Sequence, residues 1–150
     1  MGERELAQIN VGRLRAPEGD PQVADFFENL DRINAIAESS DGFIWRLVDE
    51  DGADATGITV GGDPLSLLNM SVWRDAASLA AYVYRTDHAE VMRERARFFE
   101  PHEGPFQALW FIEAGHRPTP QEGLAKLAHL REHGPTEAAF TFASASRFGA

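Results

Sequence analysis

The chain has 150 residues, 43% of them hydrophobic, and 24 acidic residues against 14 Lys and Arg give a formal net charge of -10. Because cysteine is absent from the sequence, disulfide scaffolds, iron-sulfur clusters, thiolate zinc sites and cysteine nucleophiles are excluded. The acidic balance argues against nucleic acid and anionic membranes as partners, since both are bound through clustered Lys and Arg.

The length predicts one domain that spans residues 1–150 and buries a core large enough to hold a pocket. The charged N-terminus leads into no apolar run of signal-peptide length, and nowhere do eighteen apolar residues follow one another. We therefore expect a cytoplasmic protein without a membrane span.

The first half of the chain predicts a strand, a helix and a second strand. Apolar and polar residues alternate over 6–15, which is typical of a strand. Asp20 and Pro21 form the start signal of a helix whose apolar stripe continues to Ala37. A second strand is expected at 43–48, followed by a long hairpin connection rich in turn residues.

The second half predicts two more strands, at 67–73 and 106–112, separated by a helical segment. Asp75 caps this segment, which we expect to bend near Thr86 and to end before Pro101. A further helix follows the capping box of Thr119 and Glu122 and ends at Gly134. After it we expect a short edge strand at 140–142 and a frayed end over 143–150.

This order of elements predicts an α+β protein with the ferredoxin-like split βαβ arrangement, an antiparallel four-stranded sheet and helices on one face. Each strand has an apolar side, and three strands also have a more polar side, which carries Gln8, Asn10, Asn69, Ser71, Trp73 and Gln107. The large apolar stripes of the helices favour contact with the apolar sides. The amide-bearing side then suits a pocket or a subunit interface.

Several segments spread over nearly the whole chain carry a resemblance to a known family: 6–10, 42–47, 71–73, 84–88, 115–119, 134–136 and 139–142. Through them the chain resembles a bacterial family catalogued as a domain of unknown function and similar to the antibiotic-biosynthesis-monooxygenase group. The resemblance implies a dimeric α/β barrel, in which the sheets of two subunits pack face to face, with a C-terminal extension from about residue 116. Better-understood relatives of that fold include cofactor-free monooxygenases acting on aromatic polyketides, haem-degrading monooxygenases and small isomerases.

His88 is the first candidate for chemistry, since imidazole exchanges a proton near neutral pH. On a helix it shares a face with Tyr84, Met92 and Arg95, which supply a hydroxyl, an apolar wall and a cation. The structural alternative is a histidine that packs or caps at a helix bend.

A set of Asn10, Trp73 and His88 resembles the amide, indole and imidazole of the haem-degrading relatives, with His88 as the axial ligand of a bound haem. Without haem, Asn10 or Asn69 is expected to hydrogen-bond an enolate on which Trp73 stacks. Arg46 offers a fork of donors for a carboxylate or enolate, and pairing with a surface acid is its alternative role.

We assign no ligand to the remaining arginine and histidine side chains, and we expect no metal site. Arg93, Arg95 and Arg97 alternate with acids in the pattern of a solvated face. We expect His116 to stabilise a turn. His129 and His133 lie at a helix C-terminus, where the helix dipole favours a cation.

The leading hypothesis is a homodimeric small-molecule-binding protein with an aromatic-lined pocket between sheet and helices, which acts without a cofactor as a monooxygenase or isomerase on an aromatic or enolisable substrate. One alternative is a haem-binding or haem-degrading monooxygenase. The other is a dimeric metabolite-binding protein without catalysis.

Overall fold

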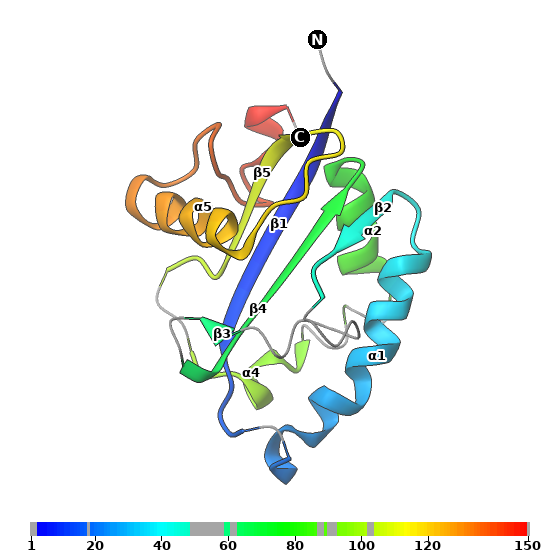
Figure 1. The fold of residues 1–150 in the computed structure, drawn as a ribbon, viewed down its shortest axis with the longest axis vertical. Coiled ribbons are helices and arrows are strands. Elements are labelled where there is room, and N and C mark those ends of the chain that lie inside the picture. The colour runs from blue at the N-terminus through cyan, green and yellow to red at the C-terminus, as the bar shows by residue number, and fades with distance from the viewer. Residues whose placement is uncertain are drawn as a thin grey trace.

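In the computed structural model, a four-stranded antiparallel sheet of order β2-β4-β1-β5 forms the centre of the molecule (Figure 1). The structure describes residues 3–17, 19–48, 59–60, 63–86, 89, 93–101 and 104–149. The strands are β1 (Arg4–Arg13), β2 (Phe43–Arg46), β4 (Asp63–Trp73) and β5 (Gln107–Glu113), and the two-residue strand β3 (Thr59–Val60) pairs with the start of β4. This order confirms the predicted split βαβ arrangement.

The helices begin and end close to the predicted signals. The 3-10 turn η1 (Pro21–Val23), capped by the Asp20 carboxylate, leads into α1 (Ala24–Ser39). Asp75 caps α2 (Ala76–Arg85), and Thr119 caps α5 (Pro120–His133). Between α2 and β5 the short helix α4 (Arg95–Phe98) is described, and α2 ends next to Thr86, where the bend was predicted.

The C-terminal segment differs from the expectation. The predicted edge strand at 140–142 is reduced to one bridge, between Phe140 and Leu109 of β5. The predicted fraying over 143–150 is also replaced, at 145–148, by the 3-10 turn η2 (Ala145–Phe148). Phe140 is fully buried and its ring stacks with that of Phe148 at a centroid distance of 5.5 Å, so aromatic packing holds this end of the chain in place.

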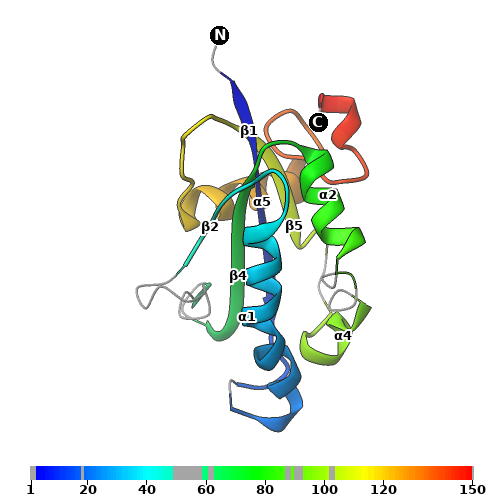
Figure 2. The ribbon, with the colours of Figure 1, turned by 90° about the vertical axis from the view of Figure 1, so that its right-hand side faces the viewer.

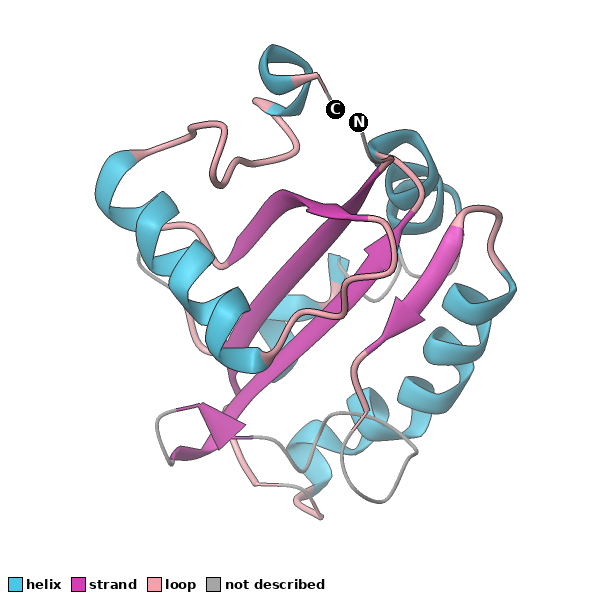
Figure 3. Cartoon of the chain, turned by 45° about the horizontal axis from the view of Figure 1, so that its top comes forward, coloured by secondary structure: helices cyan, strands magenta, loops and turns pink. Residues whose placement is uncertain are grey.

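The two faces of the sheet are covered by different helices. Figure 2 shows α2 and α4 on one side of the sheet and α5 on the other, and Figure 3 shows α5 lying across β5 and β1. The apolar sides of the strands, with Ile9, Met70 and Trp110, pack against Leu127 and Leu130 of α5. Here Gly123 permits close packing, since a Cβ on it would lie 2.8 Å from Ile9 Cδ1.

The amide-bearing side of the sheet faces α1 and α2, so the expectation that these helices meet the apolar side is wrong. The reason lies at one end of that side, where Leu6, Trp73 and Leu109 form an apolar cluster. This cluster accepts the stripes of α1 and α2, including Ile33 and Leu79, and leaves the amides at the other end of the same face beside a cavity.

Among the described helices, none is long and apolar enough to cross a membrane.

Candidate functional site

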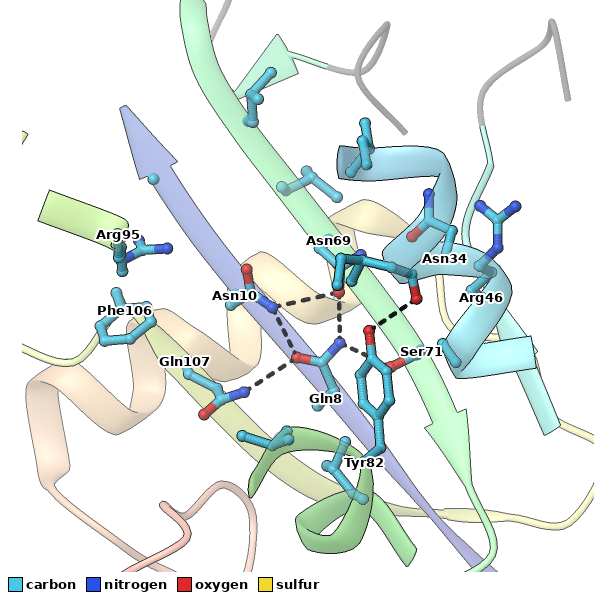
Figure 4. A pocket seen from close by; sticks show the side chains of 18 of the residues that line it. Gln8, Asn10, Asn34, Arg46, Asn69, Ser71, Tyr82, Arg95, Phe106 and Gln107 are labelled. Atoms are coloured by element: carbon cyan, nitrogen blue, oxygen red, sulfur yellow. Dashed lines mark hydrogen bonds between the residues drawn. The ribbon is translucent and has the colours of Figure 1, made fainter. Parts of the chain in front are cut away.

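A cavity of about 180 Å³ lies between the amide-bearing side of the sheet and helices α1, α2 and α4 (Figure 4). Its floor follows from the strand register. Asn10 of β1 lies opposite Asn69 of β4 on one side and Gln107 of β5 on the other. The next row places Gln8 opposite Ser71. Since side chains two residues apart in a strand point to the same side, these polar groups all face the helices.

Hydrogen bonds join the floor into one network. Gln8 Nε2 donates to Asn69 Oδ1 and Ser71 Oγ, both at 2.8 Å. Asn10 Nδ2 donates to Gln8 Oε1 at 3.1 Å and Asn69 Oδ1 at 3.3 Å, and Gln107 Nε2 donates to Gln8 Oε1 at 3.3 Å. The side-chain oxygens of Gln8 and Asn69 therefore each accept two bonds from other amides.

Two amide groups retain free donors toward the cavity. Because Asn69 Oδ1 accepts two bonds, its orientation is fixed, and its Nδ2 donates no hydrogen bond within the described part of the chain. Asn34 of α1 lines the cavity with a side chain that makes no hydrogen bond to any described residue, although the residue is only 8% exposed. Buried amides are rarely left without partners in folded proteins, so Asn34 calls for an explanation, and the half-buried Asn69 lies on the floor of the same cavity.

Apolar and aromatic side chains surround these amides. Phe26, Leu30 and Ile33 contribute from α1, and Phe99 and Phe106 from the segment around α4 and the start of β5. Among the described residues that line the cavity, none is an aspartate, a glutamate or a histidine, and two are arginines, Arg46 and Arg95. The lining therefore favours a ligand with negative charge and oxygen acceptors.

Five of the predicted site residues line this cavity: Asn10, Asn69, Trp73, Arg46 and Tyr84. Trp73 is fully buried, donates from its indole nitrogen to Ser71 Oγ at 2.8 Å and stacks on Tyr82 with a centroid distance of 5.1 Å. The indole is thus covered by protein, with Phe43 packing on it edge to face in addition to Tyr82. Tyr84 is 63% exposed and meets the ring of Phe142 edge to face. His88 and Met92 lie outside the described residues.

Arg46 pairs with an acid, its alternative role, and also lines the cavity, where its role toward a ligand stays a prediction. Its side chain is 14% exposed and pairs with Glu38 of α1 at 3.0 Å, while it also lines the cavity beside Asn34 (Figure 4). Burial raises the pKa of Tyr82 far above that of a free phenol, and the nearby charge of Arg46 only partly offsets this effect. Tyr82 donates to the Ile33 carbonyl at 3.4 Å and is therefore a neutral donor and not a base.

The assignment of Arg95 to a solvated face is wrong. Its neighbour Arg97 does pair with surface acids, Asp25 and Glu94. Arg95 instead lies partly buried over the rings of Phe99 and Phe106, and its Nη2 donates to the Val11 carbonyl at 2.8 Å. The alternation of charges along the segment gave no sign of this, because the burial of Arg95 depends on its contacts with Phe106 and with the carbonyl of Val11, which are distant in the sequence.

Glu122 has a role that the capping box does not predict. Thr119 Oγ1 accepts from the Glu122 backbone nitrogen as expected, but the Glu122 carboxylate accepts from Trp110 Nε1 at 3.0 Å and lies 2.7 Å from His116 Nε2. His116 therefore stabilises the turn before α5 through its side-chain contact with Glu122. His129 lies 3.1 Å from Thr136 Oγ1. No three metal-binding side chains come together among the residues that the structure describes.

Comparisons with known structures show the same fold in proteins of low identity. The PA3566 protein of Pseudomonas aeruginosa is 14% identical, with a TM-score of 0.51, over 77% of this chain and 99% of its own. A putative antibiotic biosynthesis monooxygenase of Nitrosomonas europaea is 11% identical, with a TM-score of 0.50, over 77% and 94%. SnoaB, a cofactor-independent oxygenase of Streptomyces nogalater, is 13% identical, with a TM-score of 0.49, over 77% and 97%.

At these identities the likeness concerns the fold alone, and no curated protein matches the sequence. A family model does match, and it covers residues 5–149. The match confirms the resemblance to a family of unknown function with monooxygenase-like structural neighbours. The chain belongs to the family DUF3291, described as a domain of unknown function.

Proposed function

We propose that this protein binds a small, planar, oxygen-bearing molecule as its phenolate or enolate anion, and that the bound anion reacts with molecular oxygen without a cofactor. The observation that carries the proposal is the pair of free amide donors, on Asn34 and Asn69, in a cavity whose described lining has no carboxylate. Fixed N–H groups in a largely apolar cavity stabilise an oxyanion as it forms.

The size of the cavity limits the ligand. A cavity of about 150 Å³ with an apolar lining is enough to bind benzene. The present cavity of about 180 Å³ therefore fits one substituted aromatic ring or an enolisable compound of similar size.

The electrostatics favour the ionised form of such a ligand. Arg95 contributes positive charge, Arg46 contributes a charge that it shares with Glu38, and the amides contribute N–H donors. Tyr82 is too weak an acid to compete for the negative charge, since burial raises its pKa. Fixed N–H donors and positive charge around the ligand oxygen act against the effect of burial, so we expect them to lower the pKa of the bound phenol and favour loss of its proton.

The chemistry balances without a reductant. An electron-rich ring carbon of the phenolate transfers an electron to O₂ and forms a C–O bond with it, which gives a peroxide anion that takes up a proton. Loss of the C–H proton from the same carbon and cleavage of the O–O bond then give a quinone carbonyl and water. One phenol and one O₂ yield one quinone and one water. An enolate that instead takes back a proton at another carbon is isomerised.

No described residue of the cavity is placed as a general base, so proton loss on binding is the route that these residues support. His88 as the base stays a prediction, because it lies outside the described residues. If a substrate turns over normally in a His88→Ala variant, that prediction is contradicted.

Haem does not fit the described residues. Its iron needs an axial ligand, and the described lining has no histidine; of its two tyrosines, Tyr82 is neutral and bonded to the Ile33 carbonyl, and Tyr84 packs on Phe142. A cavity of about 180 Å³ also holds far less than a tetrapyrrole. We therefore propose no step through haem; a Soret shift on adding haemin that is lost in His88→Ala would reopen this alternative.

Calorimetry with phenol and with toluene, which has a similar size but no oxygen, tests the binding. Phenol is expected to bind more tightly, and Asn69→Leu is expected to remove the difference. Gln121→Leu, which replaces an exposed amide on α5 across the sheet, is the control and is expected to change nothing. Equal affinity for phenol and toluene in the wild-type chain would contradict the proposal.

An oxygen electrode with resorcinol tests the reaction. Uptake of one O₂ for each hydroxyquinone formed, above the rate without protein, supports oxygenation. Binding of phenol without any O₂ uptake from resorcinol would favour the alternative of a binding protein without catalysis.

A further inference from the structure

Arg95 places a positive charge at one end of the cavity, away from Asn34. Its guanidinium carbon lies 4.2 Å from the centroid of the Phe106 ring and 4.6 Å from that of Phe99. Gly12 of β1 makes room for it, because a Cβ there would lie 2.8 Å from Arg95 Nη2. The cation is thus held between aromatic rings and the backbone of a strand.

The charge of Arg95 has no counter-charge in the described part of the chain. Arg97 and Arg46 pair with carboxylates, whereas Arg95 makes one hydrogen bond, to a backbone carbonyl. A guanidinium has five N–H donors, so most of those on Arg95 remain for a ligand. Because an unpaired charge away from water is unfavourable, burial also lowers the pKa of Arg95.

The amide floor connects this charge to the free donors at the other end. Figure 4 shows Arg95 and Phe106 at one end, Asn34 and Arg46 at the other, and Asn10 between them. Arg95 bonds to the carbonyl of Val11, and Asn69 lies opposite the preceding residue, Asn10, on the neighbouring strand about 5 Å away. A single aromatic ring with an oxygen group at each end is long enough to reach from Arg95 to Asn69.

From this placement we infer that the ligand is an aromatic carboxylate with a phenol or enol oxygen at the opposite end of the ring. Its carboxylate pairs with the Arg95 guanidinium, whose planar fork matches two carboxylate oxygens. Its phenol oxygen meets the amide nitrogens of Asn34 and Asn69. This inference rests on the proposed function and adds the second charged group of the ligand.

The test compares 4-hydroxybenzoate, phenol and benzoate by calorimetry on the full chain. We expect 4-hydroxybenzoate to bind about tenfold or more tightly than phenol, since hydrogen bonds to charged groups are among the stronger ones in proteins. Arg95→Leu is expected to abolish the preference for 4-hydroxybenzoate over phenol, and Arg95→Lys is expected to retain part of it. Arg97→Leu, on the same helix but paired at the surface, is the matched control and is expected to keep the full preference.

Each outcome decides between the two proposals. If phenol binds and depends on Asn69 but 4-hydroxybenzoate binds no more tightly, the inference about Arg95 is wrong and the proposed function stands. If the preference survives in Arg95→Leu, or is lost equally in Arg97→Leu, the assignment to Arg95 is wrong. If neither compound binds the wild-type chain, both proposals fall. Thermal unfolding of each variant establishes that it is folded, and Arg95→Gln replaces Arg95→Leu if the latter is not.

Discussion

Buried polar groups in folded proteins nearly always form hydrogen bonds, and Asn34 is an exception. Its amide is buried but makes no hydrogen bond to any described residue. A polar group in this state lowers the stability of the empty protein and is retained where a ligand needs it. The neighbouring amides of Gln8 and Asn10 differ from it, since each takes part in at least two hydrogen bonds.

The first prediction concerns this residue. Replacing Asn34 by Leu, which has a similar size, is expected to raise the free energy of unfolding by about 1 kcal/mol, because a buried group without a partner is removed. The same variant is expected to bind phenol more weakly. Urea denaturation and calorimetry measure the two effects.

Asn10→Leu is the matched control. It removes a donor to Gln8 and Asn69, so it is expected to lower the free energy of unfolding by about 1 kcal/mol. If Asn34→Leu is as destabilising as Asn10→Leu, the view of Asn34 as a residue kept for binding is contradicted.

The signal that points to Asn34 is present in the sequence. Leu30, Ile33 and Ala37 form the apolar stripe of α1, and Asn34 falls within it at a spacing of four from Leu30. A polar residue inside such a stripe lies on the buried face. Arg95 offers no such signal, because its burial depends on Phe106, which follows it by eleven residues and packs over it only in the folded chain.

At the scale of elements, the turn between α1 and β2 holds two walls of the cavity together. Gly42 in this turn has a φ of +83° and packs against Ser78 in the first turn of α2. The Gly42 carbonyl also accepts from the Arg74 backbone nitrogen at 2.7 Å. The separation of α1 from α2 therefore depends on a residue without a side chain.

Gly42→Ala is expected to lower the free energy of unfolding in two ways, through backbone strain and through a clash with Ser78. Gly115 has a similar φ of +91° but nothing within 4 Å of an added Cβ, so Gly115→Ala isolates the strain. We expect Gly42→Ala to cost about 1 to 3 kcal/mol more than Gly115→Ala. Equal losses in urea denaturation would show that the contact with Ser78 is unimportant.

The cap of α2 is expected to make stability depend on pH. Hydrogen bonds from the Ser78 side chain and backbone hold the pKa of Asp75 below its ordinary value of 3.8, and Arg74 adds to this. Ionisation of Asp75 thus favours the folded state. Its contribution to the free energy of unfolding is complete at pH values above 3.8 and is lost as the pH falls through the lowered pKa.

Asp75→Asn keeps a capping oxygen and removes the charge. We expect it to be less stable than the wild type at neutral pH, with a difference that begins to shrink as the pH falls below 3.8 and disappears below the lowered pKa of Asp75. Asp75→Ala also removes the cap and is expected to cost about 1 kcal/mol at neutral pH. A difference between wild type and Asp75→Asn that persists in acid would contradict this account.

At the scale of the whole molecule, the alternation in β1, β4 and β5 was enough to predict which residues share the amide-bearing face. The side of the sheet that α1 and α2 cover was not predictable from the same pattern. Leu6, Trp73 and Leu109 make one end of that face as apolar as the opposite face, and this is visible only once the strands are in register. The apolar stripe of α5 then takes the opposite face.

The homodimer implied by the family resemblance stays a prediction. Sedimentation at micromolar concentration measures it directly. A monomer there would mean that the cavity is formed by one chain alone.

The ionisation of 4-nitrophenol bound to the protein tests the central claim most directly, since its phenolate absorbs visible light and its pKa lies near neutrality. If the amides and arginines of the cavity stabilise an oxyanion, the pKa of the bound compound is lower than that of the free compound, and Asn69→Leu reverses the shift. An unchanged or raised pKa in the wild-type protein would show that the cavity acts on the compound as an apolar container, and would contradict the account.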